Sequence, residues 1–122
     1  MKFETISKFD KEFKKLFKKY KTLDQDLEIF KSLVRKQIQL FITKSSNHHA
    51  ILHSNKTRIT FALKSRLQCR ALKNSNLRIV YLYLEKEDKI VFIELFFKGD
   101  KSTEDTTRWR GVLQKLSDRI NQ

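Results

Sequence analysis

The sequence predicts an α+β domain in which an N-terminal antiparallel helical hairpin packs on a three- to four-stranded antiparallel sheet, followed by a C-terminal helix. Three observations lead to this fold class. Two amphipathic segments open the chain, three short apolar segments separated by polar turns follow, and helical spacing returns at the end. Because one core is viable in 122 residues and two would be marginal, residues 1–122 are expected to form a single domain.

The first two helices are predicted over residues 7–23 and 22–44. The second opens on Thr22 with Gln25 three residues later, a capping-box pattern with further acidic residues in the first turn. Only a short Lys-Thr link separates the two segments, so they are expected to form an antiparallel hairpin. Their apolar stripes are Phe9, Phe13, Leu16, Phe17 and Tyr20, then Leu23, Leu27, Phe30, Val34, Ile38 and Phe41.

Three strands are predicted in the second half of the chain. Residues 43–56 are polar and turn-rich, so they are expected to form an exposed loop tethered at Ile51 and Leu52. A strand follows from about Lys64 to Leu72, and two more follow over residues 77–84 and 89–97, which together favour an antiparallel meander. A short leading strand over residues 2–6 would add a fourth.

The closing helix is predicted after residue 101, with Ser102 or Thr103 as its N-cap. Since the first two helices cover one face of the sheet, the opposite face is expected to stay partly open. Alternation along the first meander strand places Arg66, Gln68 and Arg70 on that open face. The buried stripe of the last helix is expected to be Trp109, Val112, Leu113, Leu116 and Ile120.

Positive charge is concentrated in the middle of the chain. The net charge is +13, and no Asp or Glu occurs between Glu28 and Glu85, an interval that holds eleven Lys and Arg residues. Such self-repulsion indicates a polyanionic partner, which is nucleic acid, an anionic membrane or an acidic protein. A surface that serves only solubility would mix both signs of charge.

Other features narrow the setting. A single cysteine, Cys69, cannot form an internal disulfide, so a cytoplasmic location is expected. The longest apolar run, residues 90–97, is too short to span a bilayer, and no membrane association is expected. His48, His49 and His53 suggest a metal site, but their segment supplies no Cys or carboxylate ligand, so neither metal nor cofactor is expected.

The strand sequences carry a resemblance to a known family. "LRIVY" (Leu77 to Tyr81) and "FFKGDK" (Phe96 to Lys101) resemble strand motifs of the RelE/ParE superfamily, the small basic toxins of bacterial type II toxin-antitoxin systems. The order of elements is similar as well. The RelE branch implies an mRNA interferase that cleaves mRNA in the ribosomal A site, and the ParE branch implies a gyrase inhibitor. Either implies a cognate acidic antitoxin as partner.

The resemblance also implies roles for individual residues. Arg78 matches the arginine that contacts the scissile phosphate in the RelE branch, and Arg66 stands where that branch has a catalytic lysine, with Gln68 in place of a second one. Lys98 lies beside the basic pair that closes the final strand. No Tyr follows Lys98 and no His follows His53, so the usual aromatic or imidazole group of that strand is missing.

RNA cleavage without a metal requires a base for the 2′ proton, positive charge for the phosphorane and an acid for the 5′ oxygen. Arginine suits the charge because its planar fork grips phosphate, and Lys98 is the first candidate for the base. The expected catalytic residues are Arg66, Arg78 and Lys98. The expected RNA- or phosphate-binding residues are Lys64, Gln68, Arg70, Lys73, Tyr81 and Lys101.

Each assignment has a structural alternative. The strand arginines would then form a solvated face, Arg78 would pair with Glu94, Lys98 would only end a strand, and Tyr81 would be core packing. Three functions follow from these readings: an endoribonuclease toxin held silent by an acidic antitoxin, a gyrase-inhibiting toxin without enzymatic activity, and a plain nucleic-acid-binding domain.

Overall fold

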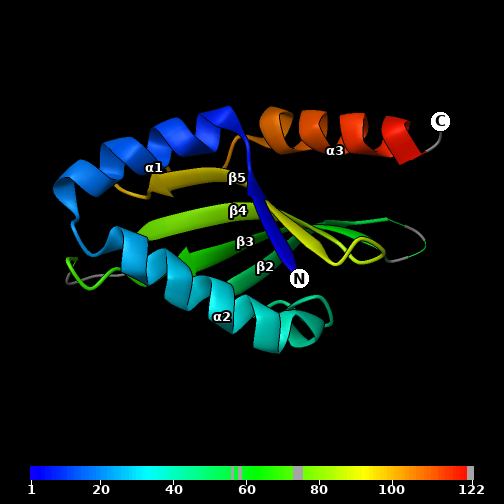
Figure 1. Cartoon of the computed structure of the whole chain (residues 1–122), viewed down its shortest axis with the longest axis horizontal. Coiled ribbons are helices and arrows are strands. Elements are labelled where there is room, and N and C mark those ends of the chain that lie inside the picture. Colours follow the sequence, from blue (N-terminus) through cyan, green and yellow to red (C-terminus); the bar gives the residue numbers. More distant parts are fainter. Residues whose placement is uncertain (56, 58, 73–75, 121–122) are drawn as a thin grey trace.

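A computed structural model describes residues 1–55, 57, 59–72 and 76–120. The elements follow in the order β1 (Lys2–Thr5), α1 (Ser7–Lys19), α2 (Leu23–Phe41), β2 (His49–Ser54), β3 (Thr60–Leu67), β4 (Leu77–Leu84), β5 (Lys89–Phe97) and α3 (Thr106–Ile120). In the described part of the chain, five strands form one sheet in the order β1-β5-β4-β3-β2 (Figure 1). β1 pairs parallel with β5, and the remaining pairs are antiparallel.

The predicted fold class, a helical hairpin on a three- to four-stranded antiparallel sheet, is wrong. The sheet is mixed and has five strands, because β1 adds a parallel edge and β2 forms inside residues 43–56, which were expected to be a loop. α1 and α2 diverge after residue 19 and lie against the sheet, α1 beside β5 and α2 over β2 and β3 (Figure 1). The apolar stripe of α2 is buried along its length, whereas Phe9 is the buried residue of the α1 stripe and the rest of that stripe is partly buried.

β2 was not predicted because half of its six residues are polar and it lies in a polar, turn-rich segment. Pairing with β3 holds β2 in the sheet, and Ser45 and Ser46 form hydrogen bonds with backbone groups on the outer edge of β2. The Ser45 hydroxyl accepts the Ile51 N–H at 3.0 Å, and the Ser46 N–H donates to the His49 carbonyl at 2.7 Å. A strand edge capped in this way presents fewer groups to another chain.

The meander of β3, β4 and β5 is confirmed, as is the leading strand β1. The first meander strand runs over Thr60–Leu67, earlier than the predicted Lys64 to Leu72. A bulge interrupts β5, where Val80 pairs with Glu94 but Tyr81 pairs with Phe92, so Ile93 is the extra residue. Residues 94–97 are consequently turned over relative to residues 89–92.

The sheet has an apolar core on each face. Phe9, Phe30, Val34 and the other buried residues of α1 and α2 cover one face, packing on Tyr81 and Phe92. On the opposite face, Trp109 of α3 packs with Val80, Leu82 and Val91. The helix α3 covers only part of this face, and the strand ends beyond it carry polar and charged residues. No helix in the described residues combines the length and hydropathy that crossing a membrane requires.

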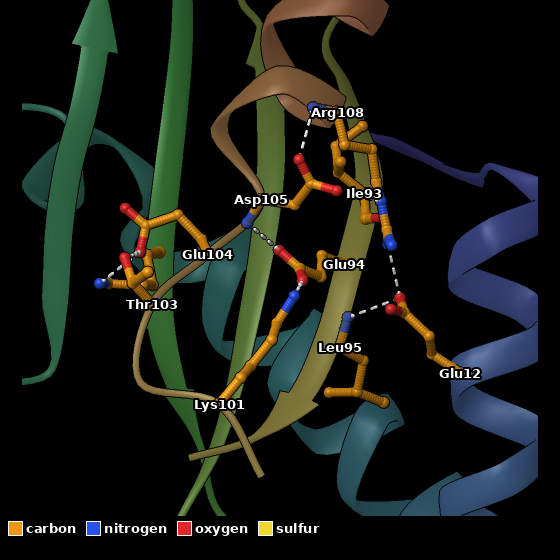
Figure 2. Close-up of polar contacts among 10 residues, drawn as sticks. Glu12, Ile93, Glu94, Leu95, Lys101, Thr103, Glu104, Asp105 and Arg108 are labelled. Atoms are coloured by element: carbon orange, nitrogen blue, oxygen red, sulfur yellow. Dashed lines mark hydrogen bonds and ion pairs between the residues drawn. The ribbon is translucent and has the colours of Figure 1, made fainter.

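The start of α3 is fixed by Asp105, not by the predicted cap Ser102 or Thr103. The Asp105 carboxylate accepts the Arg108 N–H at 3.0 Å, which is the N-cap bond to the third helical residue. The Asp105 N–H donates to the carboxylate of the buried Glu94 at 2.8 Å. Glu94 thereby ties the sheet to the helix start (Figure 2).

Glu12 and Arg108 protect the edge of β5 where β1 ends. The Glu12 carboxylate accepts the Leu95 N–H at 3.2 Å, and Arg108 Nη1 donates to the Ile93 carbonyl at 3.2 Å (Figure 2). The two side chains also form an ion pair at 2.8 Å. Burial lowers the pKa of Arg108, but the bond to Glu12 and the negative charges of Glu12, Glu94 and Asp105 together hold the pKa above its ordinary value.

We predict that Arg108→Gln lowers the free energy of unfolding by about 2 kcal/mol, because it leaves Glu12 and the Ile93 carbonyl without their partner. Urea unfolding at neutral pH measures the effect. Lys115→Gln, which removes an exposed positive charge from the same helix, is the matched control and should change stability by less than about 0.5 kcal/mol. Equal stability of the two variants would contradict this role.

Candidate functional site

Basic side chains converge at the uncovered end of the α3 face, between the start of β2 and the ends of β3, β4 and β5. They line an open pocket of about 180 Å³, here called the basic pocket. Its charged residues are Lys64, Arg66, Arg78 and Lys98, and its other wall is Ser46, Asn47, His48, His49, Ala50 and Ser65. All three predicted catalytic residues therefore lie at one place.

The register of β3 and β4 sets Arg66 directly opposite Arg78. The Arg66 N–H donates at 2.9 Å to the carbonyl of His48, which directly precedes β2, so Arg66 and Arg78 form a non-hydrogen-bonded pair, the type in which facing side chains lie closest. Burial lowers the pKa of Arg78, and the charge of Arg66 lowers it further. Two like charges facing each other across a ladder are destabilising, and a bound anion would relieve that repulsion.

Lys98 reaches the same pocket from the end of β5. Phe96 pairs with Arg78, and two residues later the Lys98 N–H donates to the Asn76 carbonyl at 2.7 Å. Lys98 therefore lies diagonally from Arg78 on one face of the sheet. Within the residues that the structure describes, neither Arg66 nor Lys98 forms an ion pair with a carboxylate.

Two other predicted cations are neutralised at the α3 side of the pocket. Lys64 forms an ion pair with Glu104 at 2.8 Å. Burial raises the pKa of Glu104, but the hydrogen bond and charge of Lys64, together with bonds from the Glu104 backbone and Thr103, hold the pKa below its ordinary value. Lys101 binds the buried Glu94 (Figure 2). These pairs neutralise two of the cations near the basic pocket, and its other charged residues are Arg66, Arg78 and Lys98.

Among the described residues, Gln68, Arg70 and Tyr81 were also predicted to bind RNA, but they do not line the basic pocket. Gln68 is exposed just beyond β3, and Lys73 lies outside the described residues. Tyr81 is fully buried on the opposite face, where its hydroxyl bonds to Ser65 at 2.9 Å and burial raises its pKa. Burial leaves Tyr81 no surface on which a base could stack.

Arg70 binds the first turn of α2. Its Nε lies 3.0 Å from Asp26, its backbone N–H donates to the same carboxylate at 3.2 Å, and its Nη2 donates to Gln25. Burial raises the pKa of Asp26, but hydrogen bonds from Thr22 and Arg70 outweigh it, so the pKa lies below the ordinary value of 3.8. Arg70 thus joins the end of β3 to α2.

His48 is the pocket residue that the sequence interpretation missed, because the histidines were considered only as metal ligands. It is exposed and lies directly beside Arg66, whose N–H its carbonyl accepts. His49 turns to the other face, stacks on Phe41 with ring centroids 3.7 Å apart and bonds to Ser65 at 2.7 Å. Burial, and then the charge of His48, lower the pKa of His49. The informative signal was the adjacency of two histidines at the start of a strand.

The described residues contain no group of three or more His, Cys, Asp or Glu side chains placed to hold a metal ion. Comparisons of the chain with protein-family models, curated proteins and solved structures found no match. The function is therefore inferred from the basic pocket itself.

We predict that Asp26→Asn lowers the free energy of unfolding at neutral pH by about 3 kcal/mol, because it removes the charge that Arg70 and Thr22 bind. The contribution of Asp26 is present above its unfolded pKa and is lost as the pH falls below 3.8. The deficit of the variant should therefore shrink between neutral pH and about pH 3 in urea unfolding. Asp24→Asn, an exposed acid in the same turn, is the control; a pH-independent deficit would contradict the assignment.

Proposed function

We propose that this protein is the toxin of a bacterial type II toxin-antitoxin system and acts as a metal-independent endoribonuclease on mRNA. The convergence of Arg66, Arg78 and Lys98 on one open pocket is the observation that carries this proposal. A strand ladder holds the two arginines rigidly, so the site is preorganised for a phosphate before the substrate arrives.

The proposed reaction is attack of a ribose 2′ oxygen on the adjacent phosphorus. Arg66 and Arg78 bind the non-bridging phosphate oxygens and stabilise the negative charge that builds up in the transition state. Lys98 lies just after the neighbouring strand β5 and gives a proton to the leaving 5′ oxygen. An open pocket between strand ends admits a single RNA strand more readily than a closed cavity would.

The resemblance to the RelE branch supports mRNA at the ribosome as the substrate, and hence action in the cytoplasm. The motifs behind it place Arg78 at the head of β4 and Lys98 just after β5. Because Lys64 and Lys101 are held in ion pairs with carboxylates, their proposed roles in binding RNA are accessory.

We predict that induced expression of the parent produces codon-phased mRNA cuts in primer extension, and that Arg66→Ala, Arg78→Ala or Lys98→Ala each lowers cleavage roughly 100-fold. Lys14→Ala, which removes the same charge from the exposed side of α1, is the control and should cleave like the parent. Growth arrest with intact mRNA and an induced DNA-damage response would instead favour gyrase inhibition, and no toxicity would favour a plain nucleic-acid-binding domain.

The cognate partner is proposed to be an acidic antitoxin that docks on α2. Ile29, Leu33 and Leu40 form an exposed apolar stripe on this helix, with Ile29 60% and Leu40 64% exposed. A pocket of about 340 Å³ at Leu40 and Lys44 shares Ser46 and His49 with the basic pocket, so the two surfaces are continuous. An amphipathic acidic helix matches both the stripe and the positive charge beside it.

We predict that Ile29→Asp with Leu40→Asp leaves mRNA cleavage unchanged but weakens binding of the acidic antitoxin by at least about 10-fold. Coexpression with the product of an adjacent short acidic reading frame, followed by growth and titration measurements, tests this. Lys86→Asp is the control, because it changes a charge in the β4–β5 turn, away from the apolar stripe. The antitoxin should neutralise the toxicity of this variant as fully as that of the parent. Full neutralisation of the double variant would place the antitoxin elsewhere.

A further inference from the structure

We propose that His48 is the general base of the RNA cleavage reaction, taking the proton of the attacking 2′ hydroxyl. This inference rests on the proposed function and adds to it the residue that directly precedes β2, outside the strands that supply the predicted catalytic set. It also fills the role that the sequence alone assigned to Lys98.

The position of His48 follows from the strand register. His49 pairs with Ser65, so His48 stands opposite Arg66, and the Arg66 N–H donates to the His48 carbonyl at 2.9 Å. Because Arg66 in turn faces Arg78, these three residues form one row that runs from the residue before β2 across β3 and β4. Facing residues in a ladder have Cβ atoms about 5 Å apart. At this spacing, one phosphodiester group can contact all three side chains.

The side chain of His48 is on the pocket side of the sheet. Its neighbour His49 turns to the opposite face, where it contacts Phe41 and Ser65, and adjacent strand residues point to opposite faces. His48 is exposed and lines the basic pocket, so RNA can reach its ring. The centroid of the His48 ring lies 6.5 Å from that of the His49 ring. Among the described residues, neither histidine belongs to a group of three or more His, Cys, Asp or Glu side chains that could hold a metal ion.

The proton balance of the reaction fits this assignment. A neutral imidazole accepts the 2′ proton while the 2′ oxygen forms a bond to phosphorus and the bond from phosphorus to the 5′ oxygen breaks. The Lys98 ammonium gives its proton to the departing 5′ oxygen, leaving a 2′,3′-cyclic phosphate and a 5′ hydroxyl. Exchange with water then returns His48 and Lys98 to their starting states, so no further reactant is consumed.

Imidazole suits this step because it is the side chain that ordinarily changes charge between about pH 5 and pH 8. A lysine must first lose a proton that it normally keeps at neutral pH, whereas an ammonium group is well suited to act as the acid. The charged or titratable groups around His48 are Arg66 and Lys64 on β3, Arg78 on β4, Lys98 after β5 and its sequence neighbour His49 at the start of β2.

The test measures cleavage of a defined mRNA by purified protein, with and without ribosomes, between about pH 5 and pH 8. The parent rate should rise with pH as the imidazole becomes neutral. His48→Gln should lower the rate by roughly 100-fold and remove that pH dependence, while binding of a non-cleavable RNA with a 2′-deoxy cleavage site stays unchanged. Free imidazole should restore part of the activity of His48→Ala.

His53→Gln is the matched control, since His53 is an exposed histidine of β2 that does not line the basic pocket, and its ring centroid lies 5.9 Å from that of Trp109. It should keep both the rate and the pH profile of the parent. If the parent cleaves, Arg78→Ala does not, and His48→Gln retains the parent rate and profile, the role of His48 is overturned and the proposed function survives. A parent without cleavage activity overturns both.

Discussion

The strand register of the β3–β4–β5 meander is the constraint on which the site depends. Side chains alternate between faces, so a slip of one residue would move Arg66 and Arg78 into the core under α2 and bring their apolar neighbours to the surface. Fully buried Leu63, Leu67, Leu77 and Ile79 on the opposite face make such a slip very costly. The hydrophobic core therefore holds two arginines face to face, although their repulsion costs a few tenths to about 1 kcal/mol.

The bulge at Ile93 decides which face receives Lys98. Without it, alternation from Phe92 would send Glu94 and Lys98 toward α1 and α2, and Leu95 toward α3. The extra residue reverses this order, so Glu94 binds Lys101 and the start of α3 while Lys98 joins Arg78. One backbone irregularity thus both anchors the last helix and completes the basic pocket.

Sequence patterns predicted the elements better than their arrangement. The apolar stripes of α1 and α2 and the three meander strands follow from periodicity, and the expectation that the ends of β4 and β5 meet follows from antiparallel pairing. The formation of β2 and the parallel pairing of β1 depend on tertiary contacts, which local sequence patterns do not reveal. The β5 bulge lies in a run so apolar that alternation was unreadable, and the partners of Arg70 and Lys64 are 44 and 40 residues distant in sequence.

The strand that the sequence did not reveal also changes the chemistry available to the pocket. The resemblance expects an aromatic or imidazole group near the final strand, and this chain has neither after Lys98. β2 pairs with β3 on the side away from β4 and β5. It thereby holds His48, the residue before it, beside Arg66 on the wall of the basic pocket opposite Lys98. Under the proposed mechanism, a phosphate between the two arginines would meet Lys98 on one side and the His48 imidazole on the other, so an acid and a base would flank the phosphate. A facing arginine pair conflicts with local stability, and such conflicts are expected where a chain is built to bind rather than to fold.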